Sequence, residues 1–242
     1  MLPYLRNKFK RSIPRPEETL NLLKDEDIFN YILQDDMNTI TTLLNDGIDI
    51  NTIDNTGYTP LMIAIICNNI IMVEFIINNN ADINTITDEN GYTPLMLAIV
   101  YSNLKIINFL IDNGANINYQ EPNTMISPIL LAIKFNRQDC IQLLISKRAN
   151  LNTQDIDQDT PLMYACVIGN LDLIELLINT GADYNIVNKY GYNTLMYAIV
   201  YNQWNIVSKL IEKDINSKFI MTNDLLFNMC PENIIEKILN SI

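Results

Sequence analysis

Three aspartates in the segment DIDQDTPLMYAC are the side chains whose spacing comes nearest to that of a metal site. Asp155, Asp157 and Asp159 alternate as the first ligands of a calcium-binding loop do. Such a loop also needs glycine at its sixth position and glutamate at its twelfth, where this chain has Thr160 and Cys166. We therefore expect no calcium site. We expect a solvated turn in front of a helix, whose N-terminus favours negative charge.

The residue types needed for catalysis are largely missing. The chain contains no histidine, which excludes a Ser-His-Asp triad, a Cys-His dyad and imidazole metal ligands. Its seven glycines form no phosphate-binding loop, and its four cysteines form no CxxC pair, so we expect reduced, packed thiols. We expect a protein that is not an enzyme and that holds no metal and no cofactor. The cysteines are Cys67, Cys140, Cys166 and Cys230.

The charge of the chain is unevenly distributed. Residues 1–16 carry five basic side chains and no acidic one, whereas the rest carries 11 basic against 28 acidic side chains. So acidic a body repels phosphate backbones, which argues against nucleic acid as a partner. The basic segment is interpreted as a solvated tail, with a nuclear-import or anionic-surface patch as the alternative. With no secretory signal and no membrane-length apolar run, we expect a cytoplasmic protein.

Two short phrases recur along the chain with a period of 33 or 34 residues, which is the pattern of a repeat protein. The first phrase is GYTPLM or a weaker copy of it, and the second ends in asparagine, as in GANIN. Both keep the same spacing over five copies. The first phrase contains Thr59-Pro60, Thr93-Pro94, Ser127-Pro128, Thr160-Pro161 and Asn193-Thr194; the second ends at Asn51, Asn84, Asn118, Asn152 and Asn185.

Each repeat is predicted to contain two helices. Thr or Ser followed by Pro is a helix start, because the hydroxyl can accept from free N–H groups and proline suits the first helical position. The short first helix should end at a residue that tolerates a left-handed backbone conformation. A second helix follows with apolar residues spaced to form one stripe. The expected helix ends are Asn68, Asn103, Asn136, Gly169 and Asn202.

This pattern resembles the ankyrin repeat, whose T-P-L-H-x-A phrase is similar to Thr-Pro-Leu-Met-Ile-Ala at Thr59. The resemblance implies an all-α solenoid of stacked helix-turn-helix units with short β-turn or hairpin connections. We expect a basic segment at 1–24, a degenerate capping repeat at 25–53 and truncated capping helices at 221–242. The five repeats between them span about 54–87, 88–121, 122–154, 155–187 and 188–220.

Several positions depart from the family pattern. Methionine or leucine replaces the motif histidine, so a hydrogen bond typical of the family should be absent. The turn glycine becomes Met125 in one repeat and Gln158 in the next, so these turns are expected to differ in shape. Pro122 stands where an aspartate usually opens the turn, and we expect irregular structure there.

The resemblance implies recognition of a protein. We expect a monomer that binds neither nucleic acid nor a membrane. It places the binding surface on the concave face, formed by the turn tips and the exposed side of the first helices. One alternative is an adaptor that recruits a ubiquitin ligase through an F-box-like helix in CPENIIEKIL; another is a substrate of an asparagine hydroxylase, modified at Asn84, Asn118, Asn152 or Asn185. The heavy use of isoleucine and asparagine suggests an A+T-rich genome, such as that of a large DNA virus or an intracellular bacterium. The resemblance then implies a host factor as partner and the host cytoplasm as location. The candidate partner-binding residues are Tyr58, Tyr92, Tyr101, Ile126, Phe135, Ile168, Tyr192 and Tyr201.

Overall fold

A computed structural model describes residues 28–86, 91–213 and 224–240, which form paired helices and no β-strand. The basic segment predicted at 1–24 lies outside these residues. The first helices are α3 (Ile28–Leu33), α5 (Pro60–Ile66), α7 (Pro94–Tyr101), α9 (Pro128–Lys134), α11 (Pro161–Ile168) and α13 (Thr194–Val200). The second helices are α4 (Met37–Asn45), α6 (Ile70–Asn78), α8 (Leu104–Asp112), α10 (Gln138–Ser146), α12 (Leu171–Asn179) and α14 (Trp204–Glu212). Two further helices follow, α16 (Asp224–Met229) and α17 (Glu232–Asn240).

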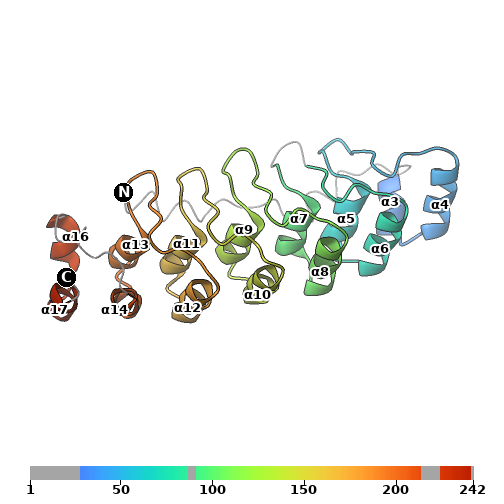
Figure 1. Cartoon of the computed structure of the whole chain (residues 1–242). Coiled ribbons are helices and arrows are strands. Elements are labelled where there is room, and N and C mark those ends of the chain that lie inside the picture. Colours follow the sequence, from blue (N-terminus) through green and yellow to red (C-terminus); the bar gives the residue numbers. More distant parts are fainter. Residues whose placement is uncertain (1–27, 87–90, 214–223, 241–242) are drawn as a thin grey trace.

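The helix pairs stack in sequence order into an elongated array (Figure 1). Each first helix packs against the next one, as in the contacts of α5 with α7 and of α7 with α9, and the connecting loops project from one edge. One continuous core of apolar side chains therefore runs along the array, because each unit covers the apolar stripe of its neighbour. None of the described helices is both long and apolar enough to cross a membrane.

The first helices begin where the Thr-Pro phrase predicts. The hydroxyl oxygens of Thr59, Thr93 and Thr160 each accept a hydrogen bond from the backbone N–H three residues later, at 3.3 Å. Ser127 and Asn193 fill the same position in the other two repeats. The Thr160 cap has a second component, since its own N–H lies 3.5 Å from the sulfur of Met163. Met163 stands where the family has histidine, and its sulfur thus accepts a hydrogen bond in this repeat although the histidine is absent.

Three of the predicted asparagines end a first helix in the left-handed conformation. Asn68, Asn136 and Asn202 have φ between 52° and 57°, and Gly169 has φ 77° in the matching place. The prediction for Asn103 was wrong, because this residue is the N-cap of α8 with φ −86°. The aligned helix end is instead at Ser102, which keeps an extended backbone with φ −113°. Serine tolerates the left-handed region less well than asparagine or glycine.

The turns between repeats share a residue in the left-handed conformation despite their different sequences. Met125 and Gln158 have φ 57° and 61°, in the region where Gly57 and Gly191 have φ 80° and 77°. The expectation of a differently shaped turn was therefore wrong for Gln158, whereas the turn that contains Met125 does differ, in its length. A turn of this kind closes with one residue in the left-handed region, which glycine occupies without steric cost.

The residue that opens the third turn is Glu121, and not Pro122 as predicted. Its N–H bonds to the Ile126 carbonyl at 3.1 Å, and its buried carboxylate accepts from the backbone N–H groups of Asn123 and Thr124. This turn is one residue longer than the one between Asp54 and Tyr58. The longer glutamate side chain spans the extra residue, which accounts for the irregularity expected in this segment.

Replacing Gln158 by glycine should raise the free energy of unfolding by about 0.5–1 kcal/mol. The left-handed conformation costs a non-glycine residue about 1–2 kcal/mol, and the added freedom of glycine in the unfolded chain offsets part of that gain. The Gln158 side chain is exposed, so few contacts are lost. The reciprocal control is Gly191→Ala, where a Cβ meets open space and the cost comes from the backbone alone. Chemical denaturation of both variants checks the prediction, and a destabilised Gln158→Gly would contradict it.

The closing asparagines join successive repeats to one another. The side-chain oxygens of Asn51 and Asn152 accept from the backbone N–H groups of Asp82 and Asp183, at 2.7 and 2.8 Å. Asn84 and Asn118 make equivalent contacts at 2.8 Å with the repeat that follows each of them. Because each bond joins two consecutive repeats, the asparagine recurs once in every repeat.

Shorter units lie at both ends of the described array. At the N-terminal end, α3 packs against α4 and α5; at the other end, α16 packs against α13 and α17 against α14. Ile234 and Ile238 of α17 are buried in these contacts. The apolar side of the F-box-like segment thus covers the last full repeat. The domain boundaries given above remain a proposal.

Candidate partner-binding surface

The eight residues predicted to bind a partner differ widely in exposure. Tyr58 and Ile126 are buried, with only 7% and 6% of their surface accessible, and they pack inside the array. Phe135 is exposed at 39% and can contact another molecule. The remaining five are half-buried and pack against the core while keeping part of the side chain at the surface: Tyr92, Tyr101, Ile168, Tyr192 and Tyr201.

The half-buried tyrosines lie in groups that hold their rings in place. Burial raises the pKa of the Tyr101 phenol, and the nearby hydroxyls of Tyr58 and Tyr92 raise it further, so the three rings lie near one another. At the other end, the Tyr201 ring stacks on the buried Tyr197 ring, with centroids 6.2 Å apart and planes 18° apart. Rings held in this way lose little conformational freedom when a partner covers them.

A row of exposed apolar side chains lies in the connecting loops, at residues that the sequence analysis did not propose as partner-binding. Met125, Ile156 and Tyr190 stand in three successive turns and are 39%, 55% and 45% exposed. A single apolar residue in a turn is no signal by itself, and only the stacking of the repeats brings these side chains into one row. We call these residues, together with Phe135 and the residues just before the turns, the hairpin surface: Ile53, Ile86, Met125, Phe135, Ile156, Val187 and Tyr190.

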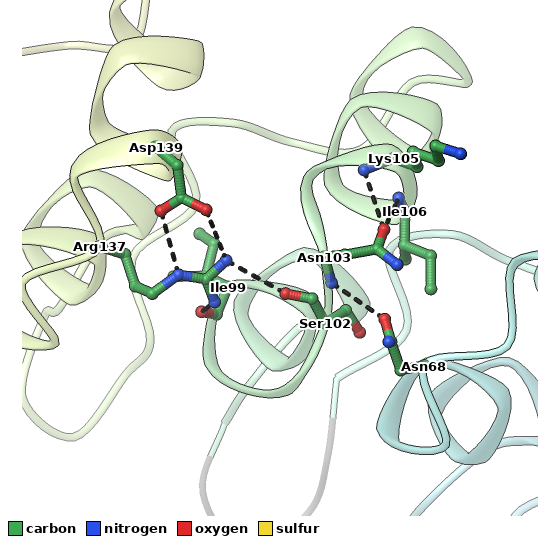
Figure 2. Close-up of polar contacts among 8 residues, drawn as sticks. All are labelled: Asn68, Ile99, Ser102, Asn103, Lys105, Ile106, Arg137 and Asp139. Atoms are coloured by element: carbon green, nitrogen blue, oxygen red, sulfur yellow. Dashed lines mark hydrogen bonds and ion pairs between the residues drawn. The ribbon is translucent and has the colours of Figure 1, made fainter.

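Arg137 positions two of the predicted ring residues, Tyr101 and Phe135, by joining neighbouring repeats. Figure 2 shows its guanidinium reaching from the start of α10 to the end of α7. There it donates to the Ile99 carbonyl at 2.8 Å and to the Ser102 carbonyl at 3.2 Å. Tyr101 directly precedes Ser102, and Phe135 comes two residues before Arg137, so the same contact fixes the segments that carry both rings.

The contact compensates for the irregular end of α7. In α5, the N–H of left-handed Asn68 closes the helix on the Ile65 carbonyl at 2.8 Å. Ser102 does not adopt that conformation. The carbonyl of Ile99, which is equivalent to that of Ile65, instead accepts a hydrogen bond from Arg137. Ser102 also ties α7 to the previous repeat, since its hydroxyl donates to the Ile65 carbonyl at 2.7 Å.

The start of α8 is bonded to the previous repeat as well. The Asn68 side chain accepts from the Asn103 N–H at 3.0 Å, and the Asn103 oxygen caps Lys105 and Ile106 (Figure 2). Asp139 holds the Arg137 guanidinium from the other side through two contacts of 3.0 and 3.1 Å. That pairing lowers the pKa of the Asp139 carboxyl below its usual value. These bonds connect three consecutive repeats along the loop edge opposite the turns.

The three alternating aspartates form a buried network, and the expectation of a solvated turn was wrong. Asp155, Asp157 and Asp159 are 4%, 2% and 2% exposed, and their carboxylate oxygens lie within 4.8 Å of one another. Asp155 accepts from the Tyr164 hydroxyl at 2.7 Å. Asp157 forms an ion pair with Lys189 of the next turn. Donors from the chain itself thus bind the carboxylates. These contacts offset the cost of burying charged groups away from water.

Asp159 connects this network to the following repeat. It accepts from the Tyr197 hydroxyl at 2.6 Å and from the Asn188 amide at 2.8 Å. Burial, and then the neighbouring carboxylates, raise the pKa of both Tyr164 and Tyr197 well above the ordinary value. Both phenols therefore keep their protons at neutral pH and donate them. The sequence contained a signal for this network. Tyr164 and Tyr197 occupy a repeat position that is aliphatic in the other three repeats, as at Ile63.

Three of the four cysteines are packed thiols, and the expectation was wrong for Cys67, which is exposed. Cys140, Cys166 and Cys230 are buried and Cys67 is exposed, and all four are free. Desolvation raises the pKa of the Cys140 thiol to about 12, and it raises the pKa of Cys67 as well. A thiol in this state is a weak nucleophile at neutral pH.

Comparisons with known proteins identify the family. A family model for ankyrin repeats (three copies) matches residues 28–121 and 129–219. Among solved structures, one similar chain comes from a complex of a predatory endopeptidase of Bdellovibrio bacteriovorus with an immunity protein. It is 24% identical with a TM-score of 0.66, and the alignment covers 77% of this chain and 99% of that one. A search of curated proteins found no match. The stacked two-helix units and the matched family model together show that this chain belongs to the ankyrin-repeat family.

Proposed function

We propose that this protein binds a partner protein through its hairpin surface and the adjoining ends of the first helices. The observation that carries the proposal is the row of exposed apolar side chains in successive turns, next to half-buried tyrosines. Met125, Ile156 and Tyr190 lie in three consecutive turns, and Phe135 lies at the C-terminal end of α9, the helix that follows the turn of Met125. Stacked repeats form extended surfaces of this kind, and aromatic residues are favoured at the centres of interfaces.

Three further observations support recognition over catalysis. The described residues contain no histidine, their buried thiols are protonated, and the buried aspartates are occupied by structural hydrogen bonds. The solved complex with a similar fold consists of two different proteins, which is consistent with such a role. We extend the proposal to a monomer in the cytoplasm of a cell, where free cysteines stay reduced. A host factor remains the kind of partner that the sequence suggests.

The other candidate functions gain less from the structure. The apolar side of α17 is buried on α14, so the F-box-like segment has a packing role already. The side chains of Asn84, Asn118 and Asn152 accept hydrogen bonds from neighbouring repeats, and a hydroxylase would have to reach them in that arrangement. We therefore favour partner binding.

Affinity capture with matched surface variants tests this proposal. The hairpin variant carries Met125→Ser, Phe135→Ala, Ile156→Ser and Tyr190→Ala, and the control variant carries Ile71→Ser and Leu104→Ser on the second helices, where the side chains are also exposed. Loss of interface anchors should reduce capture of a specific partner by at least about tenfold, since hot-spot residues contribute about 2 kcal/mol or more. The control should capture as the wild type does. A partner retained by the hairpin variant, or lost by the control alone, would contradict the proposal; circular dichroism verifies that both variants fold.

A further inference from the structure

The N-terminal end of the array is a uniformly acidic surface with exposed isoleucines. Residues 28–104 contain nine acidic side chains and no basic one. Four of these acids lie in or beside the connections that follow α4 and α6, and none of the four forms an ion pair within the described part of the chain. Three exposed isoleucines lie in the same connections. We call this set the acidic edge: Asp46, Ile48, Asp49, Ile53, Asp54, Asp82 and Ile86.

The residues of the acidic edge come from two adjacent repeats that are bonded to each other. The Asn51 oxygen accepts from the Asp82 N–H at 2.7 Å, which places the segment around Asp49 beside the one around Asp82. Asp49 and Asp82 each accept a backbone N–H two residues later, so both carboxylates are held in place and remain exposed. Fixed carboxylates next to apolar side chains fit a segment that is both basic and apolar.

The sequence of this chain contains one segment of that composition. Residues 1–16, MLPYLRNKFKRSIPRP, combine five basic and no acidic side chains with Leu2, Tyr4, Leu5 and Phe9. We propose that residues 1–16 bind the acidic edge of the same molecule. The proposal does not rest on the proposed partner, although Ile53 and Ile86 belong to both surfaces.

Chain length and linkage favour binding within one molecule. Residues 17–27 connect the basic segment to α3 and can span about 40 Å when fully extended. Since α3 packs against α4 and α5, the connection starts in the unit that carries the acidic edge. Covalent linkage gives the segment an effective concentration of about a millimolar, so even weak contacts produce substantial occupancy.

The later repeats indicate a substitution that removes charge from the acidic edge without changing its hydrogen bonds. Asn116 and Asn150 occupy in later repeats the position of Asp49 and Asp82, and they accept the same hydrogen bond two residues on. Asp49→Asn with Asp82→Asn therefore removes two charges and keeps the turn structure. Asp183 makes the same contact three repeats after that of Asp82, so Asp183→Asn is the matched control.

Limited trypsin digestion of the full chain reads out the contact, because Arg6, Lys8, Lys10 and Arg11 are cleavage sites. A synthetic peptide of residues 1–16 gives the unprotected rate, and mass spectrometry follows the products. We expect the wild type and Asp183→Asn to be cleaved about fivefold more slowly than the peptide, and the double variant at nearly the peptide's rate. Protection should weaken with added salt and should not depend on protein concentration.

Three results would overturn the inference. Cleavage of the wild type at the peptide's rate would show that the segment is not bound, and equal protection in the double variant would show that it binds elsewhere. Protection that rises with protein concentration would place the segment on a second molecule.

Discussion

Replacing Asp155 by alanine should lower the free energy of unfolding by about 3–5 kcal/mol, the largest effect expected of a single polar substitution here. Its carboxylate accepts from the N–H groups of Asp157 and Asp159, both at 2.9 Å, and from the Tyr164 hydroxyl at 2.7 Å. Each buried donor left without an acceptor costs about 1–3 kcal/mol, and relief of repulsion between the aspartates returns part of that loss. Denaturant unfolding followed by circular dichroism measures the effect.

A matched variant separates the buried network from the turn itself. Asp54 makes the same turn bonds, to the N–H groups of Thr56 and Tyr58, but it is only partly buried. Asp54→Ala should therefore cost about 1–2 kcal/mol. Asp155→Asn should cost less than Asp155→Ala, since Asn188 opens the next turn with the same bonds. Equal losses for Asp54→Ala and Asp155→Ala would show that burial of the three aspartates contributes nothing.

Replacing Arg137 by methionine should lower the free energy of unfolding by about 2–3 kcal/mol. The substitution keeps the apolar stem but removes the charged hydrogen bonds to the carbonyls of Ile99 and Ser102. A hydrogen bond to a charged group contributes about 1.5–3 kcal/mol. It also leaves Asp139 without its partner. The same substitution at exposed Arg148 should change stability by less than about 0.5 kcal/mol, as is usual for surface positions.

A double-mutant cycle tests the cause assigned to this loss. Ser102→Gly allows the end of α7 to adopt the left-handed conformation that Asn68 and Asn136 have, so backbone N–H groups can reach the carbonyl that Arg137 now satisfies. In that background Arg137→Met should cost less than about 1 kcal/mol. An unchanged cost would mean that Arg137 stabilises the array independently of the irregular helix end.

The repeat pattern of the sequence predicted most of the fold because each start signal acts locally. Thr59, Thr93 and Thr160 cap their own helices, and the apolar stripes such as Val73 and Ile76 are buried as expected. Local signals failed where a contact crosses between repeats. The helix end at Ser102 is stabilised by a hydrogen bond from Arg137, 35 residues later. No residue near Ser102 in the sequence indicates that partner.

The candidate surface was harder to predict for the same reason. A recurring tyrosine marks a position in the repeat, but only packing decides how much of the ring stays exposed, and Tyr58 and Ile126 are buried. Asp155, Asp157 and Asp159 seemed solvated because charge near a helix start usually is. The partners that make their burial tolerable, Tyr197 and Lys189, lie in the next repeat.

Site-specific photo-crosslinking tests the central claim, that the hairpin surface binds a protein. A photoreactive phenylalanine analogue replaces Ile156 in one variant and Ile71 in another; both side chains are exposed, at 55% and 64%, on different faces of the array. In cells of the source organism or its host, we predict a discrete crosslinked protein from position 156 and none from position 71. A crosslink that forms only from position 71, or none from either position with a partner bound, would contradict the account.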